Sequence, residues 1–162
     1  MLNILKCQAI YNGNIENISH TASVKNGSVV GVGVIDGDYT GGNVFEAVTP
    51  VTASLGTIEY VLVAQGEYDY ETKTVVENFT NVTGTAFMGL HLSLGDRFEL
   101  TKTDFTGTSV VGKYLIPANG VLTLAVADDL TDGTRLAFVI ESITATTGYA
   151  KSPAVQMRVV SC

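Results

Sequence analysis

The chain lacks tryptophan and is poor in several residue types that mark particular classes of protein. Its 162 residues include no Trp, two Cys, three Pro and two His, and charged residues make up only 15%. No run of about 18 apolar residues occurs, so no membrane-spanning helix is predicted. Two cysteines and two histidines form no cluster of the kind that binds zinc, and we expect neither a metal nor a cofactor.

Basic residues are also scarce. Lys and Arg together number nine against 16 Asp and Glu, which gives a net charge of -7. Contacts to nucleic-acid phosphates require clustered cations, so we expect no DNA or RNA partner. The opening residues do not combine a basic segment, a long apolar segment and a cleavage site, so we expect no export signal and synthesis in a reducing compartment. Cys7 and Cys162 are therefore expected to be free thiols, although a disulfide between them stays open.

What the chain does contain points to strands. Apolar residues make up 46%, and 17 glycines accompany many Thr and Val residues. Residues 57–65 form the first strong strand pattern, and 85–105 predicts two strands hinged at Gly95-Asp96, with Leu90, Leu92 and Leu94 on one face. Nothing shows a sustained helical period with caps, so helix should be minor.

The last third is the most regular part of the sequence. Apolar runs at about 110–116, 121–127, 135–143 and 154–160 alternate with turn segments, two of which carry Asn119-Gly120 and Asp132-Gly133. The sequence predicts an all-β fold, a small antiparallel barrel or sandwich over residues 46–162. Residues 1–45, rich in Asn and Gly, are expected to form an extended N-terminal arm with short strands.

Several short patterns suggest a binding function. Asp36-Gly37-Asp38 resembles part of a calcium loop but lacks the spacing of one, and a plain turn is favoured. A strand over 67–71 would place alternate residues on opposite faces. The acidic face consists of Glu67, Asp69 and Glu71, and the other face consists of Tyr68 and Tyr70. The acidic face could bind a cation or meet a basic partner, but a solvated outer face over two packed tyrosines is favoured. The two tyrosines, together with Tyr149, could stack on a sugar ring, but packing in the core or at its rim is the default expectation for them.

Catalytic patterns are weak. His20 and His91 are the only histidines, and no Gly-x-Ser-x-Gly nucleophile turn occurs. A triad of Ser, His and Asp would need one of these two histidines to be placed by the fold beside both partners. We expect no enzymatic activity and no catalytic residues.

Six segments in order carry a resemblance to a known family. They are VKNGSVVGVG, VFEAVTPVTASLGTIEYVLVAQGEYDYE, ENFTNVTGTAFMGLHLSLGDRFELTKTDFTG, VGKYLIPANGVLTLA, LAFVIES and AVQMRVV. Across most of residues 24–160 the chain resembles the capsid decoration proteins, or auxiliary head and cement proteins, of tailed bacteriophages. Two segments, GDYTGGNVFEA and TATTGYAKSPA, are longer than that family's pattern.

The resemblance implies a structural virion protein that is made in the bacterial host cytoplasm and binds the outer surface of the capsid. The partner of such a protein would be the lattice of the major capsid protein. The resemblance also implies a homo-oligomer, with a trimer favoured. We expect the N-terminal segment, with Val29, Val30 and Val32, and the acidic face at 67–71 to contact the shell. The alternative function is a host-glycan-binding module of a phage fibre or tail, acting through Tyr68, Tyr70 and Tyr149.

Overall fold

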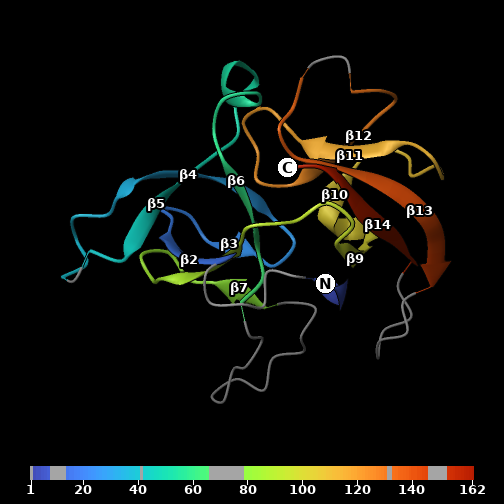
Figure 1. The fold of residues 1–162 in the computed structure, drawn as a ribbon. Helices are drawn as coiled ribbons and strands as arrows, with labels where there is room; N and C mark the ends of the chain where they lie inside the picture. Colours follow the sequence, from blue (N-terminus) through green and yellow to red (C-terminus); the bar gives the residue numbers. More distant parts are fainter. Residues whose placement is uncertain (1, 8–13, 41, 66–78, 131–132, 146–152) are drawn as a thin grey trace.

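The computed structural model describes residues 2–7, 14–40, 42–65, 79–130, 133–145 and 153–162. Within these ranges strands dominate, and no helix reaches seven residues. Two short 3-10 helices lie wholly within these ranges, η2 (Thr52–Ser54) and η4 (Lys102–Asp104). The predicted all-β fold is confirmed, and its two main parts lie side by side in Figure 1.

The first part is a small closed barrel. Its strands, in order around the barrel, are β2 (Ile15–Ser19), β5 (Val44–Val48), β4 (Val29–Ile35), β6 (Tyr60–Val63) and β8 (Phe87–Leu90). β8 pairs with β2 and closes the ring. All pairs are antiparallel except β2 with β5, which are parallel. Closure leaves the barrel without a free sheet edge.

The barrel interior is narrow and depends on glycine. Ile18, Val61 and Val63 are completely buried in its core. A Cβ on Gly89 would lie 2.6 Å from Val61 Cγ2 and 2.9 Å from Ile18 Cδ1, closer than real side chains approach. Gly89 therefore allows β8 to pack against the side chains that fill the barrel.

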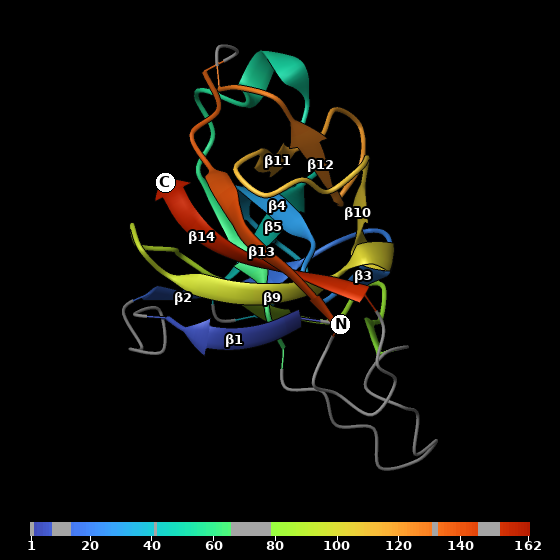
Figure 2. The ribbon, with the colours of Figure 1, turned by 90° about the vertical axis from the view of Figure 1, so that its right-hand side faces the viewer.

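The second part is an open sheet of seven strands, seen face-on in Figure 2. In spatial order they are β1 (Leu2–Lys6), β9 (Arg97–Thr101), β14 (Pro153–Ser161), β13 (Ala137–Ala145), β11 (Tyr114–Pro117), β12 (Leu124–Ala127) and β10 (Phe105–Thr106). A separate pair joins β3 (Val24–Lys25) to β7 (Thr80–Asn81).

The barrel and the sheet share the larger hydrophobic core. Phe98 of β9 and Phe138 of β13 pack edge to face with ring centroids 6.3 Å apart. Val29 and Leu62, from the barrel, belong to the same cluster and are fully buried. Because the cluster is continuous across both parts, we expect the two to fold as one unit.

The N-terminal segment differs from the extended arm expected for residues 1–45. β1 pairs with β9 in the large sheet, whereas β2 and β4 are barrel strands. The closed barrel is therefore built from residues 15–90, and the C-terminal third forms most of the open sheet. The composition of residues 1–45 indicated short strands, but it carries no information about which distant strand each one pairs with.

Two turns show where the sequence interpretation succeeded and failed. The predicted hairpin at Asn119-Gly120 is confirmed, since β11 and β12 pair antiparallel and Gly120 has a φ of 74°. Leu94 was wrongly placed on the apolar face of Leu90 and Leu92, because it is 64% exposed. β8 ends at Leu90, and the turn at Gly95 carries Leu94 out into solvent.

Candidate binding surface

The structure describes three of the residues predicted to contact a partner. Val29 and Val30 are completely buried on β4, and Val32 is half-buried against the barrel core. The side chains of Val29 and Val30 are thus core residues of the single chain and not surface contacts. The remaining candidates, Glu67, Tyr68, Asp69, Tyr70, Glu71 and Tyr149, lie outside the described residues.

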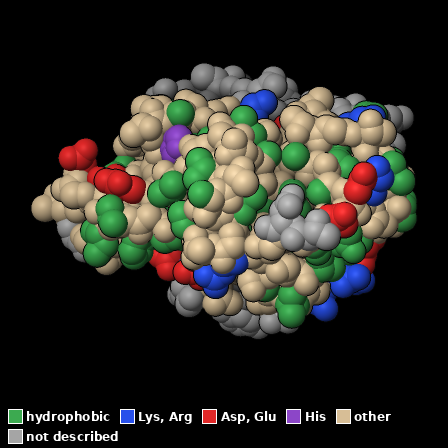
Figure 3. Space-filling view, turned by 90° about the horizontal axis from the view of Figure 1, so that it is seen from above, with side chains coloured by type: hydrophobic (Ala, Val, Ile, Leu, Met, Phe, Trp, Pro, Cys, Tyr) green, Lys and Arg blue, Asp and Glu red, His purple; other side chains and the backbone are tan. Residues whose placement is uncertain are grey.

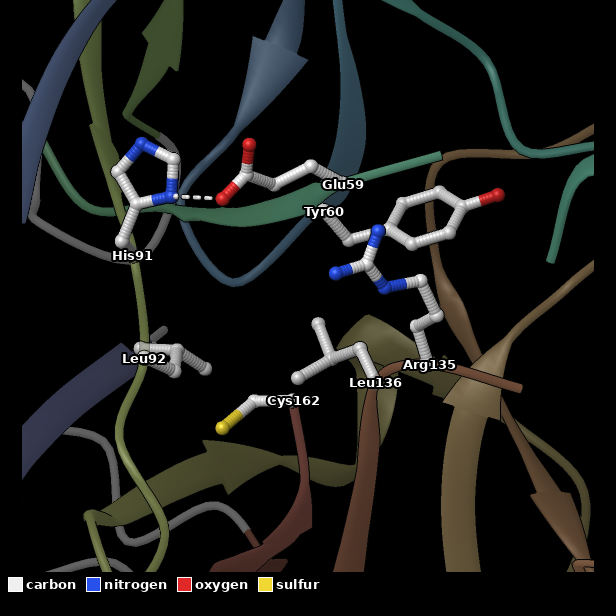
Figure 4. Close-up of a pocket in the computed structure, with 7 residues that line it drawn as sticks. All are labelled: Glu59, Tyr60, His91, Leu92, Arg135, Leu136 and Cys162. Carbon is white, nitrogen blue, oxygen red and sulfur yellow. Dashed lines mark ion pairs between the residues drawn. The ribbon is translucent and has the colours of Figure 1, made fainter. Parts of the chain in front are cut away.

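His91 lies between two carboxylates at the junction of barrel and sheet. Its Nε2 is 3.2 Å from Glu16 Oε1 on β2, and its Nδ1 is 3.2 Å from Glu59 Oε1 just before β6. Figure 4 shows the contact with Glu59. Since both ring nitrogens face carboxylates, the imidazole links β2 to the start of β6.

A small pocket of about 70 Å³ adjoins this histidine. Its lining includes Cys162 and Arg135 (Figure 4). Burial, and then the negative charge of Asp96, raise the pKa of the Cys162 thiol, which favours the protonated and unreactive form. The pocket is far below the roughly 300 Å³ of usual ligand sites.

A larger hollow of about 450 Å³ lies at the end of the barrel. Its carboxylates are Asp36, Asp38 and Glu46. The Ser19 hydroxyl donates to Asp36, and the backbone N–H of Asp38 donates to the same carboxylate at 3.0 Å. In that order, these two bonds lower the pKa of Asp36 and keep it charged. Within the described ranges, no group of three or more His, Cys, Asp or Glu side chains is arranged to hold a metal ion.

An apolar surface lies where the β11–β12 turn meets the segment before η2. The Thr52 N–H donates to Asn119 Oδ1 at 2.9 Å, and the Gly120 N–H donates to the Pro50 carbonyl at 2.8 Å. These bonds hold together two loops whose Val51 and Val121 side chains are 43% and 44% exposed. We call Val51 and Val121 the valine pair; their loops expose apolar side chains beside a hydrogen-bonded backbone.

Figure 3 views the molecule from above and shows hydrophobic side chains scattered among polar side chains and backbone, with acidic and basic side chains at several places on the same face.

Sequence reasoning missed the valine pair. It identified Asn119-Gly120 as a turn, but a single sequence does not show that this turn rests on Pro50 and Thr52. The signal present was modest: each valine directly adjoins a turn residue, Pro50 or Gly120. Valine is unusual in such positions, since turns favour polar or small residues.

The chain matches no protein-family model, and no curated protein sequence matches it significantly. Among the residues the structure describes, no helix is both long and apolar enough to cross a membrane.

Proposed function

We propose that the chain is a structural virion protein that binds the outer surface of a bacteriophage capsid and decorates or stabilises it. The resemblance of its strand and turn segments to capsid decoration proteins suggests this role. The observation that carries the proposal is the valine pair, an exposed apolar surface on two hydrogen-bonded loops. The proposal makes the major capsid protein lattice the partner and the virion surface the location.

The chemistry of the described residues supports a binding role. His91 links two structural elements through Glu16 and Glu59, and the raised pKa of Cys162 disfavours its thiolate. Many copies on a repeating lattice also need only modest affinity each, because the shell offers many equivalent sites. The valine pair would supply an apolar part of each such contact.

The identity of the binding partner is tested first on particles. Purified virions should contain the chain in many copies by quantitative mass spectrometry. Density that accommodates the barrel and the sheet should cover the outer shell in electron microscopy. Absence of the chain from virions, or density for it only at the tail, would overturn the proposal.

The contact surface is tested by adding purified protein to particles that lack it. Val51→Lys combined with Val121→Lys should lower occupancy at least about tenfold, since each removes roughly 1.5 kcal/mol or more of apolar burial. The matched control is Leu94→Lys, which also places a charge at an exposed apolar position but in a different turn. Equal occupancy of both variants would exclude the valine pair as the contact.

A further inference from the structure

A row of basic side chains crosses three adjacent strands of the large sheet. Lys6 of β1 lies opposite Arg97 of β9, and Arg97 lies opposite Arg158 of β14. Directly opposed residues on antiparallel strands project from the same face. Phe98 and Met157, the next opposed pair, are buried in the core, so the basic row faces outward. These three side chains are a third of the nine basic residues in the chain.

Among the residues that the structure describes, Glu141 forms hydrogen bonds with two members of the basic row. Glu141 Oε2 accepts from Arg97 Nε at 2.9 Å, and Glu141 Oε1 accepts from Arg158 Nε at 2.6 Å. One carboxylate thus serves two guanidinium groups, which remain 47% and 38% exposed. Lys6 is exposed as well. Like charges placed opposite each other are unfavourable, and an acidic partner would relieve this repulsion.

The acidic hollow at the barrel end has the complementary charge. Asp38 and Glu46 are exposed at its rim, and Asp36 lies between them in the lining. Tyr39 Oη donates to the Gly84 carbonyl at 2.7 Å, which ties the segment carrying Asp36 and Asp38 to the turn before β8.

The two charged surfaces lie at opposite ends of the molecule. In Figure 1 β4 and β5 are at the left and the seven-stranded sheet is at the right. Figure 2 looks onto the outer face of that sheet, with β4 and β5 behind it. A surface at one end that complements a surface at the other is the condition for a head-to-tail contact between copies.

We propose that copies of this chain associate head to tail, the basic row of one copy entering the acidic hollow of the next. Lys and Arg side chains are long enough to reach carboxylates inside a hollow, and guanidinium groups pair with two carboxylate oxygens at once. Repeated use of one such contact gives a closed ring or an open filament, according to the rotation between neighbours. The contact does not use the valine pair and stands whether or not the chain binds a capsid.

Mass measurement of the wild-type chain is the first test. Sedimentation velocity over a concentration series at low salt should show species larger than the 17.1 kDa monomer. Raising the salt should dissociate them, since exposed charge pairs are screened over about 8 Å at physiological ionic strength. A monomer at every concentration up to about 1 mM in low salt would overturn the proposal. The dissociation constant would then exceed about 1 mM, which is too weak for a specific contact.

Two variants separate the two ends of the contact. Lys6→Glu with Arg158→Gln alters the basic row, and Asp38→Lys with Glu46→Lys alters the hollow. Each should raise the apparent dissociation constant at least about tenfold. An equimolar mixture should form a dimer and nothing larger, because each variant retains one intact surface. Lys25→Glu and Asp128→Lys are controls at exposed charges elsewhere and should leave association unchanged.

The mixing result distinguishes this contact from a symmetric dimer. In a symmetric dimer one surface pairs with itself, so mixing would not restore association. A mixture that stays monomeric, or a variant that associates like the wild type, would contradict the proposal. Should a variant fail to fold by circular dichroism, carbodiimide cross-linking of the wild type decides. In a mixture of isotopically labelled and unlabelled chains, Lys6 of one copy should be cross-linked to Asp38 or Glu46 of another. If cross-links between copies occurred only at other residues, the proposal would be refuted.

Discussion

The barrel and the seven-stranded sheet solve the problem of exposed strand edges in different ways. The barrel closes on itself, so each of its five strands has two neighbours. The sheet stays open, with β1 and β10 at its two edges. Its inner face is covered because the barrel packs against it and shares the core around Phe98. The barrel is therefore stabilised by pairing all of its strand edges, whereas the sheet is stabilised by burying its inner face against the barrel.

The largest expected effect comes from the core that the two parts share. Phe98→Ala should lower the free energy of unfolding by about 3–5 kcal/mol, because it removes a fully buried ring and leaves a cavity. Denaturant titration followed by fluorescence and circular dichroism should still give one transition. Separate transitions for barrel and sheet in the wild type would show that the parts are independent. Val34→Ala, at a 68% exposed position, is the control.

Closure of the barrel is tested by Gly89→Ala. The added Cβ would meet Val61 at 2.6 Å, and we expect a loss of about 1–3 kcal/mol from overpacking. Gly37→Ala is the matched control, since a Cβ there meets nothing within 4 Å. Thermal unfolding of the two variants measures the difference. Equal stability of the two variants would mean that the barrel interior has room for a Cβ at position 89.

The His91 contacts are expected to matter less. His91→Ala removes the link between β2 and the segment before β6 and leaves Glu16 near Glu59, at a cost of about 0.5–1.5 kcal/mol. A double-mutant cycle with Glu16→Gln isolates the contact from the loss of side-chain volume. Strictly additive effects in that cycle would mean that the contact contributes nothing to joining the strands.

The smallest effect belongs to the exposed face of the sheet. Hydrogen bonds from Arg97, and then from Arg158, lower the pKa of Glu141 in the folded state. A lowered folded-state pKa gives stability that is present above the ordinary value of 4.5 and is lost as pH falls through the folded value. The wild type should therefore exceed Glu141→Gln by less than about 1 kcal/mol at neutral pH. Unfolding curves at a series of acidic pH values should show this advantage disappear, and an advantage that grew in acid would contradict it.

The comparison also explains what a single sequence could and could not predict. The β11–β12 hairpin was predictable because the two strands pair through a short turn at Asn119-Gly120. The hairpin signal at Asp132-Gly133 was wrong about pairing, because β13 pairs with β11 and β14 and not with β12. The barrel was not predictable, because β2 pairs with β5 on one side and with β8 on the other. Val29–Ile35 is apolar or Gly throughout, so alternation could not indicate which side chains face the core.

The candidate surfaces were harder still to predict. The valine pair depends on contact between residues 50–52 and 119–120, and the basic row depends on the register of three strands. Lys6, Arg97 and Arg158 are far apart in sequence and look like isolated charges there. Tertiary pairing alone makes them neighbours.

The pairing of β1 with β9 constrains how the chain folds as the ribosome makes it. Leu2 lies opposite Leu100, so β1 must wait while the residues between them are synthesised. At roughly 5–20 residues per second this takes on the order of 5–20 s. Barrel strands β2, β4, β5, β6 and β8 all emerge within that interval and can close first. We therefore expect the barrel to form early and β1 to join the sheet only after β9 has left the ribosome.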